Sequence, residues 1–120
     1  MRVHLEPQLA IIDIDRWQMV QAIVNLLQNA VDAMADKERR VLSITARVDE
    51  GQMRIVISDT GAGIASANVA KIFDPFFTTK GERGTGLGLY IAKQVIEDHR
   101  GTINVQTGDR GTAFVISLPL

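Results

Sequence analysis

Cysteine is absent from this chain of 120 residues. That absence excludes a disulfide scaffold, a zinc site with cysteine ligands and a thiol nucleophile. A surplus of basic residues is absent too, because 13 lysines and arginines stand against 14 acidic residues and give a net charge of −1. Proteins that bind nucleic acid usually show such a surplus, so we expect no nucleic-acid partner.

Long apolar runs are also lacking. No stretch approaches the roughly 18 residues that a membrane span needs. Met1 is not followed by the basic start, apolar stretch and small-residue cleavage site of a signal peptide. A chain of this length with 46% hydrophobic residues can build one core. We therefore expect a single domain over residues 1–120, without membrane contact.

Glycine and phenylalanine are concentrated in one window of the sequence. Six of the ten glycines lie between Gly61 and Gly88. Three of the four phenylalanines, at positions 73, 76 and 77, fall in the same window. The need to fill a core does not explain this crowding, so the window is the first candidate for a functional site.

Four strands are predicted by runs of β-branched and apolar residues. Residues 41–48 and 52–59 predict one hairpin, and residues 102–107 and 112–118 predict a second hairpin around a Gly-Asp-Arg-Gly turn. Residues 2–13 predict short extended pieces that are interrupted at a proline. Adjacent hairpins make the sheet at least partly antiparallel.

Helical periodicity predicts the other layer. A helix is expected from a cap at Asp13 or Asp15 to about Ala35. One further helical turn is expected near residues 68–73, and a last helix over residues 85–99 ends with Gly101 as its cap. The expected fold is a two-layer α/β sandwich, with a mixed, mostly antiparallel sheet of about five strands and about three helices on one face.

The first predicted helix combines a broad apolar face with a narrow polar stripe. At about 100° per residue, the apolar face consists of Val20, Ile23, Val24, Leu27, Val31 and Met34. The stripe consists of Gln21, Asn25, Asn29, Asp32 and Asp36. A solvated face is one interpretation, but asparagine costs about 0.5 kcal/mol in a helix relative to alanine. The i, i+4 asparagines project from one side, where an amide oxygen can ligate Mg²⁺.

Two glycine-rich segments have ligand-binding chemistry. Residues 59–64 (DTGAGI) follow an apolar strand; the Asp59 carboxylate can accept from an exocyclic amine of a base, although an ordinary turn has the same composition. Residues 84–89 (GTGLGL) begin the last helix, where backbone N–H groups can hold phosphate. Leu89 replaces the third glycine of a dinucleotide fingerprint, and no P-loop string occurs.

The segment between them, residues 72–81 (IFDPFFTTKG), places three aromatic rings beside glycines. It predicts a loop that packs over a ligand through its phenylalanines, with Lys80 able to reach a phosphate. The alternative is a surface loop that the phenylalanines anchor to the core.

Taken together and in this order, the segments resemble the sequence boxes of the ATP-binding catalytic domain of bacterial sensor histidine kinases, within the Bergerat-type ATPase superfamily. Residues 25–34 (NLLQNAVDAM) resemble the N box, 59–64 the G1 box, 72–80 the F box and 84–92 (GTGLGLYIA) the G2 box. The resemblance covers roughly residues 10–119. The FFTTK wording of the F box resembles the nitrogen-regulation, dicarboxylate- and oxygen-sensing subgroup.

The resemblance implies a binding site for Mg·ATP. Asn29 would ligate Mg²⁺, Asp59 would accept from the adenine amine, and Thr112 would support Asp59 or a bound water. Residues 72–86 would form an ATP lid, with Lys80 as its phosphate contact. Catalytic roles would fall to Asn25, Asn29 and Lys80. The nucleotide contacts implied are Asn25, Asn29, Asp32, Ala33, Asp59, Gly61, Gly63, Ile64, Ile72, Phe77, Thr79, Lys80, Thr85, Gly86, Leu87, Gly88, Leu89 and Thr112.

The resemblance also implies partners and a location. The γ-phosphate would pass to a histidine on a separate dimerisation and phosphoacceptor domain, and from there to a response regulator. Neither His4 nor His99 has the expected setting of such an acceptor. The domain would be cytoplasmic, in a parent protein that can be anchored in a membrane.

Relatives that hydrolyse ATP carry a glutamate where this chain has Asn25. Because an amide cannot take a proton near neutral pH, Asn25 argues against efficient hydrolysis. A hydrolase of the same fold, a serine kinase and an adapter without catalysis are the alternatives.

Overall fold

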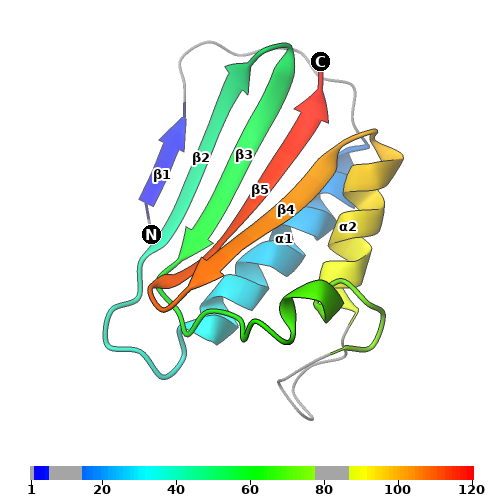
Figure 1. Cartoon of the computed structure of the whole chain (residues 1–120). Helices are drawn as coiled ribbons and strands as arrows, with labels where there is room; N and C mark the ends of the chain where they lie inside the picture. The colour runs from blue at the N-terminus through cyan, green and yellow to red at the C-terminus, as the bar shows by residue number, and fades with distance from the viewer. Residues whose placement is uncertain (1, 6–14, 78–86) are drawn as a thin grey trace.

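The computed structural model describes residues 2–5, 15–77 and 87–120, which form two layers (Figure 1). A five-stranded sheet has the order β1-β2-β3-β5-β4, and β1 pairs with β2 in parallel while every other pair is antiparallel. The strands are β1 (Arg2–Leu5), β2 (Leu42–Asp49), β3 (Gln52–Asp59), β4 (Thr102–Gly108) and β5 (Gly111–Pro119). The predicted mixed, mostly antiparallel sheet of five strands is confirmed.

Two α-helices, α1 (Arg16–Ala33) and α2 (Gly88–Asp98), cover one face of the sheet. The described residues hold one more helical element, the 3-10 turn η1 (Val69–Lys71). The predicted turn near residues 68–73 is therefore present, but it spans only three residues. Two α-helices and this turn stand where about three helices were expected.

Turn chemistry sets the first hairpin. Between β2 and β3, Glu50 and Gly51 both have positive φ, at 51° and 77°. A two-residue turn of this kind matches the twist of the strands that it connects. The resulting register pairs Asp59, the last residue of β3, with Leu42 on one side and Thr112 on the other.

Asp15 is the cap of α1, because its Oδ1 accepts from the backbone N–H of Gln18 at 3.1 Å. The alternative cap, Asp13, lies outside the described residues. The helix ends at Ala33, two residues before the predicted Ala35. The predicted helix is thus present, with its end slightly overestimated.

The buried face of α1 agrees with the predicted face only in part: Met34 is buried, and Ile23 and Leu27 pack against the core as predicted. The side chains that α1 buries are Met19, Ala22, Leu26 and Ala30. Three valines of the predicted face, at positions 20, 24 and 31, are 49%, 53% and 52% exposed. Alanine takes little space, so the two alanines let α1 pack closely, whereas a count of apolar residues favours valine. Asn25 and Asn29 consequently lie half-buried at the border of the buried face and not opposite to it.

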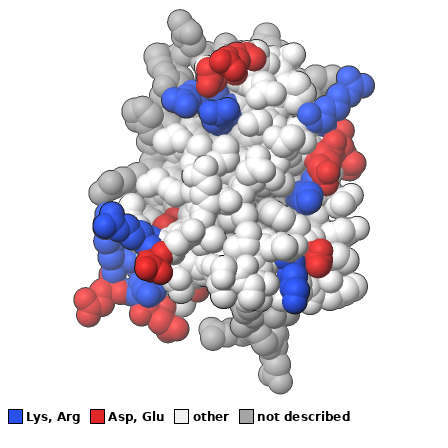
Figure 2. Space-filling model, viewed as in Figure 1, with Lys and Arg blue, Asp and Glu red and all other residues white. Residues whose placement is uncertain are grey.

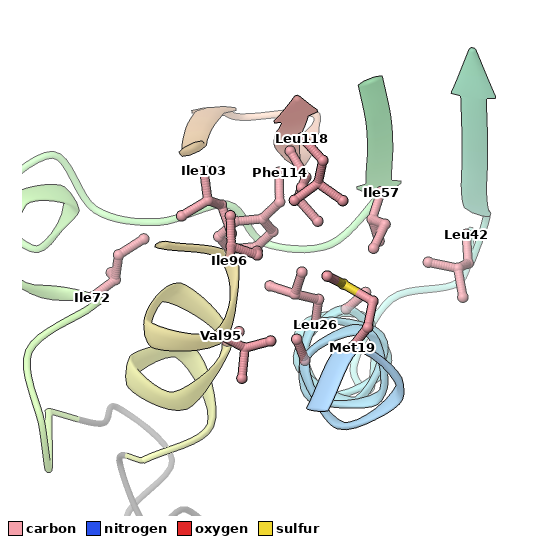
Figure 3. Packing of buried hydrophobic residues seen from close by; sticks show 14 of the residues in the cluster. Met19, Leu26, Leu42, Ile57, Ile72, Val95, Ile96, Ile103, Phe114 and Leu118 are labelled. Carbon is pink, nitrogen blue, oxygen red and sulfur yellow. The ribbon is translucent and has the colours of Figure 1, made fainter. Parts of the chain in front are cut away.

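The core lies between the helices and the sheet. In Figure 3, Met19 and Leu26 of α1 and Ile96 of α2 point toward Ile57 and Phe114 of the sheet. Leu26, Ile57, Ile96 and Phe114 are all at most 1% exposed. This packing fixes the end of β3 against the middle of α1.

The end of α2 corrects the predicted cap. Arg100, and not Gly101, takes the left-handed position, with φ at 63°. The N–H of Gly101 donates to the Ile96 carbonyl at 2.8 Å and that of Arg100 to Glu97 at 2.9 Å, which is a Schellman motif. Gly101 is needed for space instead, since a Cβ there would lie 2.5 Å from the Ser117 carbonyl oxygen.

Charged side chains on the face seen in Figure 2 form small groups in which basic and acidic residues lie side by side. This arrangement agrees with the near-zero net charge. Neither helix in the described part of the chain is long and apolar enough to cross a membrane.

Candidate functional site

Asp59 is a buried carboxylate at the end of β3. It is 6% exposed, and its Oδ1 accepts from the backbone N–H of Gly61 at 2.8 Å. Burial raises the pKa of Asp59, and hydrogen bonds from the backbone of Gly61 and Thr112 oppose that rise. Among the described residues no basic side chain forms a salt bridge with it. Asp59 is thus an acceptor that a ligand with a polar hydrogen can use.

The turn after Asp59 is docked on the last residue of α1. The N–H of Ala62 donates to the Ala33 carbonyl at 3.2 Å. A Cβ on Gly61 would lie 2.6 Å from the same carbonyl oxygen, so only glycine fits there. Ala33 contributes through its backbone, by holding the turn in place.

The turn is also docked on the hairpin between β4 and β5. Gly63 has φ of 78°, and a Cβ there would lie 2.3 Å from the Gly108 carbonyl oxygen. The N–H of Ile64 donates to Thr107 Oγ1 at 2.8 Å, and Thr107 Oγ1 lies 2.9 Å from Thr112 Oγ1. Gly63 is therefore needed both for its φ and for the close approach of the two turns.

Thr107 and Thr60 are residues of this region that sequence reasoning missed. Thr60 Oγ1 accepts from the N–H of Val41 at 3.0 Å and donates to the Arg39 carbonyl at 2.9 Å. It thereby ties the turn to the segment before β2. Threonine is common in strands and turns, so neither residue stands out by type. The only available signal was that Thr107 precedes a predicted hairpin turn and faces Thr112 across it.

Two hollows flank the hairpin turn. One of about 560 Å³ has Asp59, Thr107 and Thr112 in its wall. A second of about 540 Å³ is lined by Ile64 and Val69 from one side and by Thr107 from the other. Neither is lined by Asn25 or Asn29, so these hollows belong to the strand side of the site.

The helix side of the site joins α1 to the start of α2. Asn25 Nδ2 donates to the Gly88 carbonyl at 3.1 Å, across 63 positions in sequence. Gly88, Leu87 and Leu89 are half-buried. Leu87, the N-cap residue of α2, makes no side-chain cap bond, and the backbone N–H groups of α2 begin beside Asn25. This bond brings the predicted N box and G2 box together.

Asn29 and Asp32 have different surroundings, one and two turns further along α1. Asn29 is half-buried, and no hydrogen bond joins its amide to another described residue. Asp32 is exposed and accepts from Gln28 Nε2 at 3.0 Å. Asn29 therefore has the more suitable placement for a ligand contact.

Phenylalanines anchor the segment before residue 78 to the core. Phe73 packs edge-on against Phe114, with ring centroids 6.2 Å apart, and Phe77 also contacts the core beside the buried Ile72. Phe76 is 73% exposed, with φ of 68°. The anchoring interpretation holds for two of the three rings, whereas the Phe76 ring is mostly exposed. The predicted contacts Thr79, Lys80, Thr85 and Gly86 lie outside the described residues.

His99 fastens the two helices together. Its Nε2 accepts from the N–H of Asp15 at 2.9 Å, and its Nδ1 lies 2.7 Å from the Val95 carbonyl. The carbonyl can only accept, so Nδ1 holds the ring proton. Both ring nitrogens of His99 are thus engaged in contacts that hold the two helices together.

The donor set of the site suits Mg²⁺ better than a transition metal. The described residues hold no group of three His, Cys, Asp or Glu side chains that could bind a metal ion. Mg²⁺ typically keeps water and phosphate oxygens and takes only one or two protein oxygens. The half-buried amide oxygen of Asn29 can supply one of them.

Comparison with known proteins extends these observations. Residues 14–120 match the model of a family described as histidine kinase-, DNA gyrase B- and HSP90-like ATPases. The chain is 38% identical over 104 residues to the C4-dicarboxylate transport sensor protein DctB of Rhizobium meliloti, which covers 87% of the chain and 17% of DctB. It is 40% identical over 119 residues to sporulation kinase A of Bacillus subtilis, covering 98% of the chain and 19% of that kinase.

Solved structures agree with this result. The nucleotide-free catalytic domain of histidine kinase ThkA superposes with a TM-score of 0.84 at 34% identity, covering 98% of the chain and 76% of that domain. Full-length ShkA in complex with AMPPNP superposes with a TM-score of 0.84 at 28% identity, covering 98% of this chain and 25% of ShkA. The chain therefore spans less than a fifth of both curated relatives.

Proposed function

The chain belongs to the family of histidine kinase-, DNA gyrase B- and HSP90-like ATPases, and from this membership we propose that it binds Mg·ATP and supplies the γ-phosphate to a histidine. The acceptor histidine lies on a separate dimerisation and phosphoacceptor domain of the parent protein, which passes the phosphoryl group to a response regulator. In the first step the bond from the γ-phosphorus to the β–γ bridging oxygen breaks. A bond to an imidazole nitrogen forms, ADP leaves and the imidazole loses a proton.

The base of the nucleotide is held at the strand side of the site. The Asp59 carboxylate accepts from the exocyclic amine of adenine, and Thr112 supports it from the opposite strand. The Gly61–Ile64 turn lets backbone approach the ring. Burial of Asp59 without a basic partner among the described residues supports this role. A guanine carbonyl at the same position would meet a carboxylate and be repelled.

The phosphates are held at the helix side. Backbone N–H groups at the start of α2 face the anion, and glycine in residues 84–88 leaves room for close approach. Lys80 would be a further phosphate contact from the lid proposed over residues 72–86, of which residues 78–86 lie outside the described part of the chain. Asn29 would hold Mg²⁺, and the ion would neutralise phosphate charge. Phosphoryl transfer asks the protein mainly for positioning and charge neutralisation, which these groups supply.

Asn25 favours transfer over hydrolysis. Its amide donates to the Gly88 carbonyl and so positions the phosphate-binding end of α2. An amide cannot remove a proton from water, so this helix position offers no general base. We therefore expect ATP to be held for an acceptor histidine and hydrolysed slowly, below about 1 s⁻¹, the low end of ordinary enzyme turnover.

The observation that carries the proposal is that α1 contacts both sides of the site, the turn after the buried Asp59 through the Ala33 carbonyl and the start of α2 through Asn25. Calorimetric titration with ADP tests it, with Mg²⁺ and with a chelator. Labelled ATP mixed with candidate acceptor domains then tests transfer. Absence of binding at millimolar nucleotide would overturn the proposal.

Asn29→Ala tests the magnesium contact. Loss of the amide oxygen should weaken ADP binding about tenfold in Mg²⁺, the cost of roughly one charge-assisted contact, and leave binding in chelator unchanged. Gln18→Ala, at an exposed residue of the first turn of α1, is the matched control and should bind like the parent. Equal weakening with and without Mg²⁺ would show that Asn29 does not act through the metal.

A further inference from the structure

The hydroxyl of Thr107 lies where three segments of the site meet. It accepts from the N–H of Ile64 at 2.8 Å, lies 2.9 Å from Thr112 Oγ1 and lies 3.4 Å from the Gly111 carbonyl oxygen. Thr107 also lines both hollows beside the hairpin turn. The proposed function gives this residue no role.

The proton of this hydroxyl can be assigned from its partners. An N–H group can only donate, so Ile64 uses one lone pair of Thr107 Oγ1. The single proton of Thr107 then goes either to Thr112 or to the Gly111 carbonyl. The distance of 2.9 Å to Thr112 is ordinary for a hydroxyl donor, whereas 3.4 Å to the carbonyl exceeds the usual range. Either hydroxyl can be the donor in the 2.9 Å bond, and on this comparison of distances we assign Thr107 as the donor to Thr112.

A Thr112 hydroxyl that accepts from Thr107 keeps its own proton for another acceptor. Thr112 is directly opposite Asp59 in the register of β3 and β5, and both are less than 10% exposed, at 4% and 6%. The site thus presents an acceptor and a donor side by side. Adenine carries an amine donor beside a ring-nitrogen acceptor, whereas guanine has a carbonyl acceptor in place of the amine.

We propose that Thr107 is a positioning residue for the base, which directs the Thr112 proton toward the nucleotide and thereby contributes to the choice of adenine over guanine. The inference rests on the proposed function, because it requires the base to lie at Asp59. Thr107 acts through Thr112 and through the anchored Ile64 backbone, without touching the phosphates.

Thr107→Val and Thr107→Ser separate the hydroxyl from the shape of the side chain. Calorimetric titration of the full chain uses ADP, GDP and tripolyphosphate, a probe without a base. Thr107→Val should weaken ADP binding about tenfold, the value of roughly one hydrogen bond, and reduce the preference for ADP over GDP. Tripolyphosphate binding should stay unchanged. Thr107→Ser keeps the hydroxyl and should bind within about twofold of the parent chain.

Two controls make the test specific. Thr102→Val changes an exposed threonine of the same strand and should alter no affinity. In a Thr112→Val background, Thr107→Val should cause no further loss of base preference, because residues that act through one another are not additive. If Thr107→Val does not fold, as judged by its melting curve, Thr107→Ala removes the same hydroxyl with less bulk.

The possible results distinguish failure of the inference about Thr107 from failure of the proposed function. An unchanged ADP-to-GDP preference in Thr107→Val overturns the inference alone, as does an equal loss in Thr107→Ser. A matching loss of tripolyphosphate binding also overturns it, since a general structural defect would then account for the data. A parent chain that binds no ADP overturns the proposed function, and the inference fails with it.

Discussion

The strand side and the helix side of the candidate site are held by different kinds of contact. On the strand side, Asp59, Thr107 and Thr112 are tied to backbone or to each other by hydrogen bonds of 2.8–2.9 Å. On the helix side, a bond of 3.1 Å connects Asn25 to α2, and Asp32 and Leu87 also have interaction partners. The segment that leads into residue 78 is anchored to the core by Phe73, Phe77 and the buried Ile72. The groups proposed to hold the base are thus fixed by short polar contacts, whereas the segment beside the helix side is anchored by apolar ones.

The largest expected effect is at the strand side. Gly63→Ala should cost roughly 3 kcal/mol of stability or more and abolish nucleotide binding, because a Cβ would lie 2.3 Å from the Gly108 carbonyl oxygen in a left-handed backbone. Gly51→Ala is the matched control, since Gly51 has the same φ within a degree but open space around it. It should cost about 1 kcal/mol. Urea unfolding measures the free energy of unfolding of both variants. An equal loss in the two would show that the turn at Gly63 can move away from the turn at Gly108.

Asp59→Asn should have the next largest effect. It should weaken nucleotide binding but raise the free energy of unfolding. Loss of the charged acceptor should weaken ADP binding about 10- to 100-fold. Without nucleotide the variant should gain stability. Burial raises the pKa of Asp59 above its ordinary 3.8. As pH rises, the unfolded chain therefore loses this proton before the folded one, and ionisation favours unfolding.

Unfolding experiments across pH check that sign. The stability of Asp59→Asn minus that of the parent chain should increase as pH rises above 3.8 and level off beyond the raised pKa. Asp74→Asn, on an exposed carboxylate, is the control. If the stability difference between Asp59→Asn and the parent chain stays constant with pH, then burial of the ionised Asp59 carboxylate does not destabilise the strand side.

The elements of the fold and the family were predictable because their signals are local. Runs of β-branched residues and the turn at Glu50-Gly51 predicted the hairpins, and the order of four motifs predicted the family that the comparisons confirm. The individual nucleotide contacts remain predictions.

Three-dimensional details that depend on close packing were not predictable. Half of the predicted apolar face of α1 was wrong, since the two alanines that pack closely rank below the three valines that stay exposed, whereas Ile23, Leu27 and Met34 do contact the core. Arg100 in a left-handed cap also has no local signal, because a glycine follows it and is the usual residue for that position. The role of Thr107 depends on two turns that meet only in the folded chain.

The smallest expected effect is on the helix side, where Lys93 Nζ of α2 lies 5.2 Å from the centre of the Phe73 ring. Lys93→Gln should cost about 0.5 kcal/mol, a shift of roughly 2 °C in melting temperature, because partly exposed cation–π contacts are weak. In a Phe73→Leu background, Lys93→Gln should cause no further loss of stability. Lys71→Gln changes an exposed lysine of η1, two residues before Phe73, and is the matched control that should leave the melting temperature unchanged. A loss as large as that of Gly63→Ala would mean that the helix side is held as firmly as the strand side.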